Sequence, residues 1–332
     1  MKTKLFFLLF FISFSSFAQQ YTLIPNANFE KRLIALGYDS GPVDGKVLTA
    51  NISSITDLDV SSQDIKNLTG IQDFVNLEYL NCSYNQLTAL DISKNITLTT
   101  LYCYSNQITT LDVSKNTTLK ILKCSFNQLT TLDVSKNTAL IGLNCGSNKL
   151  TTLNVSKNTA LTSLDCGSNK LTTLDISKNI SLIELYCYFT PLTILDISKN
   201  TALTDLKCYS NQLTSLDVST NTALTILNCS NNQLTTLDVS TNTALTILSC
   251  DSNPLTTLDV SINTALTSLY CSSNRLTSLN IKNGNNSSLQ SRDFKGNPNL
   301  SCILVDGATF SNSNWARYKD ATASYSDTNC PN

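Results

Sequence analysis

The chain has 332 residues, of which 23 are Lys or Arg and 24 are Asp or Glu, so its formal net charge is -1. A near-neutral chain lacks the basic field that grips a phosphate backbone, and this argues against nucleic-acid binding. It contains no histidine, which excludes Ser-His-Asp relays, Cys-His relays and histidine-ligated zinc sites.

Residues 1–18 have the pattern of a secretory signal peptide. Lys2 and Lys4 precede an apolar stretch from Leu5 to Phe17, and Ala18 completes a small-x-small cleavage motif. The stretch is shorter than the ~20 apolar residues that a membrane span needs. We therefore expect export to the periplasm, the cell surface or the medium, and no membrane span in the mature chain.

Residues 19–54 are predicted to form an N-terminal helical cap. Asn26 or Asn28 can cap a helix whose apolar residues Phe29, Leu33 and Leu36 share one face, and Gly37 ends it. The segment 39–45 that follows is rich in Asp and Gly but lacks the acidic spacing of an EF-hand loop. We interpret it as a plain turn, with calcium binding as the alternative.

A 21-residue period dominates the rest of the chain. Residues 77–286 contain ten repeats of the template L-x-x-L-x-C-x-x-N-x-L-T-x-L-D-V-S-x-N-T-x, and residues 55–76 form one divergent repeat of 22 residues. Each repeat has two halves, the L-x-C half and the L-D-V half, in which apolar and polar residues alternate as in half-buried strands. A single repeat buries too little to fold alone, so we expect a β-rich solenoid of stacked coils with parallel β-sheets, a right-handed turn and a cap at each end.

The motif L-x-x-L-x-C-x-x-N-x-L resembles a leucine-rich repeat, and its 21-residue, cysteine-bearing form resembles the internalin J type of repeat. The flanks at 24–37 and 297–306 are similar to those of secreted Bacteroidetes leucine-rich-repeat proteins. The resemblance implies a recognition surface rather than an enzyme.

Ten of the twelve cysteines recur at place six of the template, where a leucine would fit equally well. We interpret them as a ladder of small buried hydrophobic residues. Zinc binding by stacked thiolates is the alternative, but no pair has C-x-x-C spacing and buried thiolates are costly. Cys302 and Cys330 lie outside the ladder, in the predicted C-terminal cap at residues 287–332, and are expected to form a disulfide there.

The candidate ligand-binding residues are those at places three, five, seven and eight, which the core does not need and which differ between repeats. Two groups of aromatic and charged residues stand out among them, at Tyr79, Tyr84, Tyr102, Tyr104, Lys123 and Phe126, and at Glu184, Tyr186, Tyr188, Phe189, Lys207 and Tyr209. A small-residue saddle, with Gly142, Gly146, Ser163 and Gly167, separates them. Aromatic side chains are favoured at interfaces, although strand propensity alone is the plainer explanation.

The L-D-V half is monotonous, with Thr or Ser and Asp outward in almost every repeat. A row of lysines at place 18 stops after Lys199, which leaves an acidic end at residues 217–262. This end offers calcium or a cationic partner as an alternative. We favour it less, because the carboxylates form a single row and do not converge on one point.

The sequence therefore predicts a non-catalytic, cofactor-free and monomeric binding or adhesion module that recognises a protein or peptide through the L-x-C half. A glycan ligand and a structural surface-layer role are the alternatives. An enzyme acting on a polysaccharide through Glu184 and Asp205 is the least favoured one, because no activated nucleophile accompanies that pair.

Overall fold

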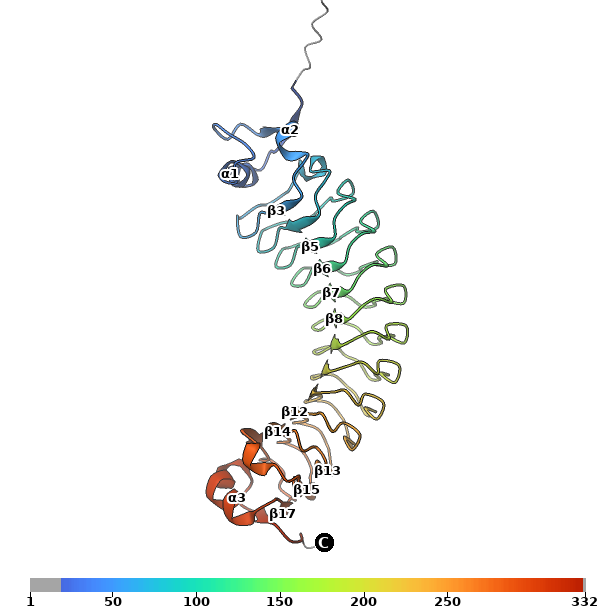
Figure 1. Ribbon diagram of the computed structural model, residues 1–332, viewed down its shortest axis with the longest axis vertical. Coiled ribbons are helices and arrows are strands. Elements are labelled where there is room, and N and C mark those ends of the chain that lie inside the picture. Colours follow the sequence, from blue (N-terminus) through green and yellow to red (C-terminus); the bar gives the residue numbers. More distant parts are fainter. Residues whose placement is uncertain (1–18, 331–332) are drawn as a thin grey trace, which may run out of the picture.

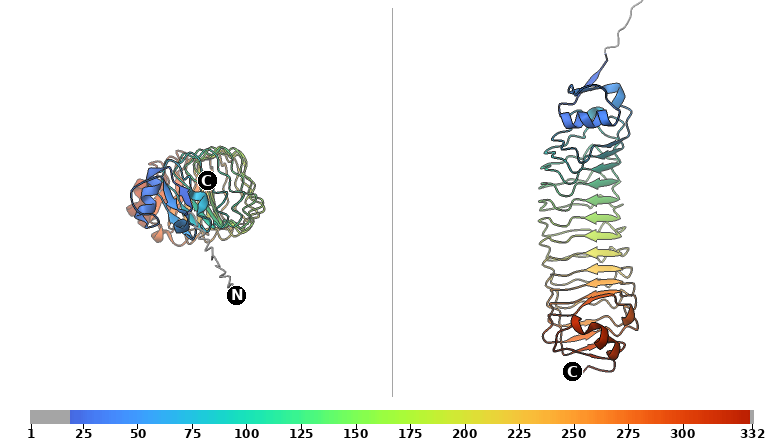
Figure 2. Two further views of the ribbon diagram at one scale, coloured as in Figure 1. Left: turned by 90° about the horizontal axis from the view of Figure 1, so that it is seen from above. Right: turned by 90° about the vertical axis from the view of Figure 1, so that its left-hand side faces the viewer.

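The computed structural model describes residues 19–330, and the predicted signal peptide at residues 1–18 lies outside the described residues. The chain winds into a solenoid whose stacked coils follow an arc (Figure 1). Its strands run across the long axis, one above the other (Figure 2). The predicted β-rich solenoid with parallel sheets and a helical cap at the N-terminus is confirmed.

The L-x-C halves form one parallel sheet of twelve strands. Each strand covers places three to five, and equivalent residues of successive coils are register partners, as Leu122 is with Leu143. The strands in chain order are β3 (Asp57–Asp59), β4 (Tyr79–Asn81), β5 (Thr100–Tyr102), β6 (Ile121–Lys123), β7 (Gly142–Asn144), β8 (Ser163–Asp165), β9 (Glu184–Tyr186), β10 (Asp205–Lys207), β11 (Ile226–Asn228), β12 (Ile247–Ser249), β14 (Ser268–Tyr270) and β16 (Ser291–Asp293).

The prediction of a strand in every L-D-V half is wrong for most coils. Among the described residues only β13 (Thr257–Asp259) and β15 (Ser278–Asn280) are strands there, and they form a four-stranded sheet, in the order β13-β15-β17-β18, with β17 (Cys302–Leu304) and β18 (Ser324–Ser326) of the C-terminal segment. In the earlier coils side chains take up the backbone groups instead. Asp133 Oδ1 accepts the N–H of Ser135, and the Asn137 amide donates to the carbonyl oxygens of Val113 and Asn116.

The core is a continuous column of leucines, isoleucines, valines and cysteines. Six apolar side chains per coil point inward, for example Leu119, Leu122, Cys124, Leu129, Leu132 and Val134, all of them buried. All ten ladder cysteines are buried free thiols, as the sequence predicts. Burial raises the pKa of each thiol, to about 12 for Cys82 and Cys208. A neutral thiol behaves here as a small apolar side chain.

The N-terminal end is covered by α1 (Ala27–Ala35), as predicted. Asn26 is its N-cap and accepts the N–H of Phe29 at 3.0 Å, while Phe29 and Leu33 are fully buried against the first coil. Around it lie the antiparallel strands β1 (Tyr21–Leu23) and β2 (Lys46–Leu48), the helix α2 (Thr49–Ile52) and the 3-10 turn η1 (Ile71–Asp73).

The turn at residues 39–45 is held by protein groups. The buried Glu30 carboxylate accepts the N–H groups of Asp44 and Gly45 at 2.7 and 2.8 Å, and Lys46 pairs with Asp44. The carboxylate that faces this turn is thus engaged by the backbone, which agrees with the interpretation as a plain turn.

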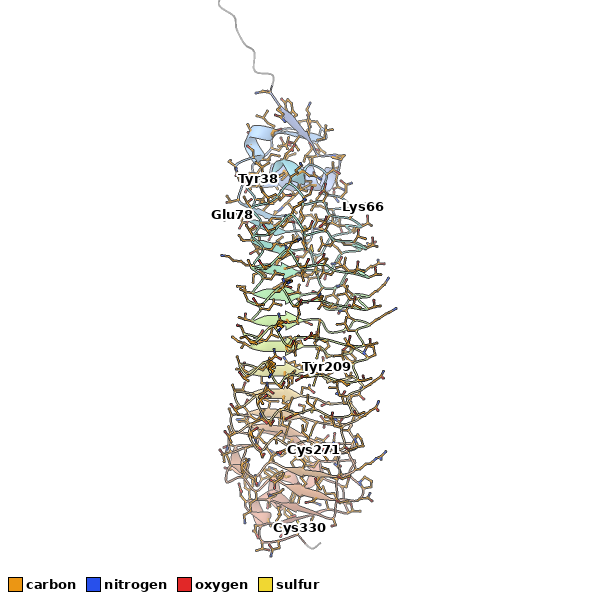
Figure 3. All side chains as sticks on the ribbon, turned by 90° about the vertical axis from the view of Figure 1, so that its right-hand side faces the viewer. Tyr38, Lys66, Glu78, Tyr209, Cys271 and Cys330 are labelled. Carbon is orange, nitrogen blue, oxygen red and sulfur yellow. A yellow bond between two sulfur atoms is a disulfide. The ribbon has the colours of Figure 1, made fainter. Side chains whose placement is uncertain are left out.

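The C-terminal end is covered by α3 (Ala308–Trp315), after η2 (Asn286–Ser288) and before η3 (Ala316–Tyr318). Trp315, the last residue of α3, is buried. Cys302 and Cys330 form a disulfide with a Cα–Cα distance of 5.5 Å, and Cys330 lies at the far end of the solenoid (Figure 3). Both sheets continue into this segment, through β16 and through β17 and β18.

Candidate functional site

The predicted ligand-binding residues lie on the outward side of the twelve-stranded sheet and in the turns that directly follow its strands. Places three and five lie on the strands themselves, so Tyr79, Tyr102, Glu184, Tyr186 and Lys207 point outward from β4, β5, β9 and β10. Places seven and eight lie just after each strand. We call the surface formed by these four places in all coils the L-x-C face.

The first aromatic group packs over the strands β4 to β6. Tyr79 meets Tyr102 edge to face with ring centroids 5.5 Å apart, and Tyr104 meets Tyr84 in the same way at 5.1 Å. Together with Phe126 and Lys123, three of these tyrosines line a hollow of about 270 Å³. Tyr84, at place eight of the first repeat, packs in this cluster together with the other rings of its group.

The second aromatic group is tighter than the sequence suggests. Tyr188 and Tyr209 stack in parallel with centroids 4.9 Å apart, and Phe189 packs edge-on against both. Burial, followed by the charge of the nearby Asp165, raises the pKa of Tyr188 to about 12. Its hydroxyl is therefore a neutral hydrogen-bonding group at physiological pH.

Tyr186 stands apart from these three rings and belongs to a charged network. Its hydroxyl donates to Asp205 at 2.8 Å, Lys207 lies 4.3 Å above its ring, and Lys207 also pairs with Asp205 at 3.3 Å. Burial and the adjoining Asp205 carboxylate raise the pKa of Tyr186. The network holds Tyr186 in one orientation at the edge of the saddle.

The saddle between the two groups is a second hollow of about 260 Å³. Ile121, Lys123, Gly142, Leu143, Asn144, Ser163, Asp165 and Tyr186 line it. It shares Lys123 and Asn144 with the first hollow, so the two hollows are neighbours along the solenoid, and we call them together the trough. The sequence-based site residues do not include Asn144 and Asp165. Their position at place five of the two saddle repeats was the signal that could have identified them.

The glycines of the saddle create space. A Cβ atom on Gly167 would lie 2.8 to 2.9 Å from ring atoms of Tyr188, and one on Gly146 would lie 3.0 Å from an Asp165 carboxylate oxygen. Neither glycine has a positive φ. The glycines are therefore needed for space and not for backbone conformation, because they allow the Tyr188 ring and the Asp165 carboxylate to pack closely against the sheet.

Place eight has a left-handed backbone in every coil of the 21-residue series, a feature that sequence reasoning missed. The recurrence of Ser and Asn there was the available signal, since small polar residues tolerate that conformation. In three coils the place is aromatic instead: Tyr84 (φ 54°), Phe126 (53°) and Phe189 (49°). These rings are 59%, 63% and 57% exposed, so core packing does not account for them.

Glu184 and Asp205 are register partners, as their spacing predicts. Each is already engaged, Glu184 by the Ser163 hydroxyl at 2.9 Å and Asp205 by Tyr186 and Lys207. Within residues 19–330, no cluster of three or more His, Cys, Asp or Glu side chains is arranged to hold a metal ion. No helix in the same part of the chain is both long and apolar enough to cross a membrane.

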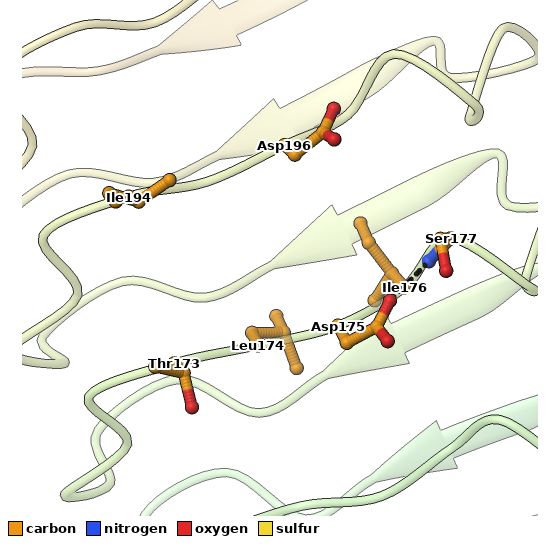
Figure 4. A pocket seen from close by; sticks show the side chains of 7 residues that line it. All are labelled: Thr173, Leu174, Asp175, Ile176, Ser177, Ile194 and Asp196. Atoms are coloured by element: carbon orange, nitrogen blue, oxygen red, sulfur yellow. Dashed lines mark hydrogen bonds between the residues drawn. The ribbon is translucent and has the colours of Figure 1, made fainter.

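The L-D-V half has more than one open depression, with volumes of about 330 and 250 Å³. The first is lined by Thr173, Leu174, Asp175, Ile176, Ser177, Ile194 and Asp196 (Figure 4). Asp175 accepts the N–H of Ser177 in a turn that recurs along the solenoid. Ile194 occupies the outward place that holds Thr or Ser in most other coils. The depression is thus repetitive structure with one exposed isoleucine, unlike the varied trough on the L-x-C face.

No protein-family model matches the chain, and no curated protein does either. Among solved structures, the functional domain of InlJ from Listeria monocytogenes, which includes a cysteine ladder, is 37% identical, with a TM-score of 0.80 over 87% of this chain and 68% of that one. The internalin InlF of the same organism is 22% identical (TM-score 0.55; 82% of this chain, 96% of that one). The ectodomain of the Arabidopsis thaliana receptor kinase GASSHO1/SCHENGEN3 is 19% identical (TM-score 0.67; 78% and 36%).

The two more distant structures share the fold. The InlJ domain shares the cysteine ladder as well, at an identity and coverage that a common fold alone does not produce. The chain therefore belongs to the internalin-like family of leucine-rich-repeat proteins.

Proposed function

We propose that this chain is a non-catalytic, exported binding or adhesion module that captures a protein or peptide on its L-x-C face. Export to the cell surface or the medium agrees with the signal-like residues 1–18 and with the disulfide between Cys302 and Cys330. The fold accommodates such partners, since the GASSHO1/SCHENGEN3 ectodomain was solved in complex with CASPARIAN STRIP INTEGRITY FACTOR 2.

The observation that carries the proposal is the placement of Tyr84, Phe126 and Phe189. Strand propensity explains an aromatic residue on a strand, but these three lie after the strand in a left-handed conformation that bulky residues rarely adopt. They are also more than half exposed. Neither the backbone nor the core benefits from them, which leaves recognition as their use.

The coil that carries Phe189 breaks two further rules of the repeat. Thr190 replaces the asparagine of place nine, and Pro191 follows it. Thr190 takes part in the ladder only through its hydroxyl, 2.7 Å from the Cys187 carbonyl oxygen and 2.6 Å from Asn211 Oδ1. Departures from a repeat are typical of functional sites, and here they coincide with the second aromatic group.

The test replaces Tyr186, Tyr188 and Tyr209 by Ser in the full exported chain. Partners captured from culture or host extract by the wild type should be lost from the variant, and its thermal melting curve should stay nearly unchanged. Tyr270→Ser is the matched control, because Tyr270 occupies place five on β14, outside both aromatic groups. Its capture should equal that of the wild type.

Two results would contradict the proposal. If the triple variant unfolds, the rings are structural. If Tyr270→Ser loses capture equally, binding is not located at the aromatic groups. Capture of glycans in place of proteins would support the alternative ligand class.

A further inference from the structure

The trough on the L-x-C face has opposite charges at its two sides. Lys123 extends from β6, exposed and stacked 4.8 Å above the Tyr102 ring, and it makes no salt bridge with any residue in the described range 19–330. Across the saddle, the half-buried Asp165 on β8 accepts the backbone N–H of Gly167 and faces the Tyr188 hydroxyl, and it makes no salt bridge within residues 19–330. Two strand spacings, about 10 Å, separate the two residues.

The other charges around the trough strengthen this polarity. Glu184 lies on the neighbouring strand β9, where it is the register partner of Ser163 and accepts the Ser163 hydroxyl. The Lys207 ammonium acts on Asp165 through its charge, but it forms its ion pair with Asp205 at 3.3 Å. Within residues 19–330, the side of the trough toward the C-terminus therefore has the Asp165 and Glu184 carboxylates outside any salt bridge, and the side toward the N-terminus has the Lys123 ammonium outside any salt bridge.

We propose that the trough binds an extended peptide that carries an acidic side chain at Lys123 and a basic side chain at Asp165, with an apolar or aromatic side chain in the first hollow. This inference rests on the proposed function and specifies its ligand. An extended chain advances about 3.3 Å per residue, so about 10 Å corresponds to an acid and a base two to four residues apart. The hollow beside Tyr84, Tyr102, Tyr104 and Phe126 receives the neighbouring apolar side chain.

A glycan fits this charge pattern less well. A neutral glycan would use the rings and be indifferent to Lys123 and Asp165. A sulfated or sialylated glycan would need Lys123 but would be repelled by the two carboxylates on the other side. Only a ligand with both signs satisfies both sides of the trough.

The experiment pans a display library of random linear twelve-residue peptides against the full exported chain. We expect enrichment of peptides that contain Asp or Glu two to four residues from Lys or Arg, next to an aromatic residue. The enriched peptides are then synthesised, and their Kd is measured for the wild type, Lys123→Ser and Asp165→Asn. Each variant should weaken binding about tenfold.

A double-mutant cycle assigns each charge. A peptide whose acidic residue is changed to its amide should bind the wild type about tenfold more weakly, and Lys123→Ser should cost that peptide nothing further. The same holds for the basic residue and Asp165→Asn. Lys149→Ser and Asp175→Asn are the matched controls, since both residues are exposed and lie outside the trough, and neither should change Kd.

The outcomes separate this inference from the proposed function. If the enriched peptides need Tyr186, Tyr188 and Tyr209 but bind Lys123→Ser and Asp165→Asn as tightly as the wild type, the charge assignment is overturned and the binding face stands. If no peptide is enriched while the full chain still captures a protein that needs Tyr186, Tyr188 and Tyr209, the extended-peptide ligand is wrong and the binding face stands. If an array of anionic glycans binds and Asp165→Asn strengthens that binding, the ligand is a glycan and the peptide assignment is wrong.

Discussion

The two halves of each coil meet the same requirement, the pairing of their backbone groups, in opposite ways. In the L-x-C half the twelve-stranded sheet pairs them, strand to strand. In the L-D-V half of most coils, Asp and Asn side chains do so, as Asp133 does for Ser135 and Asn137 for Val113. Where strands pair with each other, the outward side chains are not needed for backbone pairing and can be of almost any type. Where a side chain must bond a backbone group, it has to be Asp or Asn.

This difference explains why one half varies and the other is monotonous. Only some outward residues of the L-x-C half bond the backbone, as Asn144 does for Gly146, so most of them can be specialised for a ligand. The Asp and Asn residues of the L-D-V half make the same backbone hydrogen bonds in almost every coil, and replacing them removes those bonds. The variable surface is therefore the surface where function can reside.

The largest expected effect concerns the ten thiols, all of which lie in the L-x-C half. Their pKa is raised in the fold, to about 12 for Cys82 and Cys208, so the unfolded chain releases these protons first. The stability they contribute is fully present below pH 9 and is lost as the pH rises toward 12. At pH 10 each thiol should cost about 1.4 kcal/mol, or on the order of 10 kcal/mol for the ladder, and the solenoid should unfold.

Urea titrations at pH 8 to 10.5 measure this loss. Cys124→Val is the matched variant, because Val60 occupies the same place in the divergent first coil. The free energy of unfolding of this variant should fall about one tenth less steeply with pH than that of the wild type, because nine thiols titrate instead of ten. Equal slopes for the two proteins would show that the thiols are not responsible.

A smaller effect distinguishes the two asparagine ladders. The Asn127 amide donates to the carbonyl oxygens of Cys103 and Cys124, and its Oδ1 accepts the N–H of Ile108 at 3.0 Å. Asn137 donates to the carbonyl oxygens of Val113 and Asn116, which also accept backbone N–H groups, and its Oδ1 has no partner. Only the loss of Asn127 leaves a backbone N–H unpaired.

We therefore expect Asn127→Ala to cost about 3 kcal/mol and Asn137→Ala about 1 kcal/mol. Urea midpoints at an unchanged m-value give both numbers. A larger loss for Asn137→Ala would mean that the L-D-V half depends more heavily on its side chains than its hydrogen bonds indicate.

Most of the fold can be predicted from the sequence, because the apolar residues that recur in every repeat are the buried ones. Its period fixes which residues stack, so the cysteine ladder, the strand at places three to five and the Asn26 cap of α1 follow from patterns of spacing. Hydrogen bonding of the L-D-V half does not follow, since apolar alternation is the same whether the backbone pairs with a neighbouring strand or with Asp and Asn side chains. The strands expected there were wrong for this reason.

The candidate site is only half visible in the sequence. Aromatic residues at Tyr186, Tyr188 and Tyr209 stand out against the template, but the left-handed backbone at Phe189 and the space that Gly167 leaves for the Tyr188 ring depend on three-dimensional packing. The opposition of Lys123 and Asp165 also needs the structure, because 42 positions in sequence separate the two residues and only the stacked coils bring them to one trough.

The smallest expected effect lies on the monotonous face. Asp133 is exposed, and hydrogen bonds from Ser135 lower the pKa of its carboxyl group. The stability that this carboxylate contributes is present above its unfolded pKa of about 4 and is lost as the pH falls through its lower folded value. Solvent screens such a contact, so Asp133→Ala should shift Tm by no more than about 2 °C at pH 7.

Asp133→Asn is the informative partner variant, because an asparagine keeps the oxygen that accepts the Ser135 N–H and loses only the charge. It should melt with the wild type at every pH between 3 and 7 if the turn, rather than the charge, is what the aspartate row provides. A marked loss in Asp133→Asn alone would instead show that the row of carboxylates acts electrostatically. The L-D-V half would then carry a property that its hydrogen bonds do not explain, and the division of labour between the two halves would have to be revised.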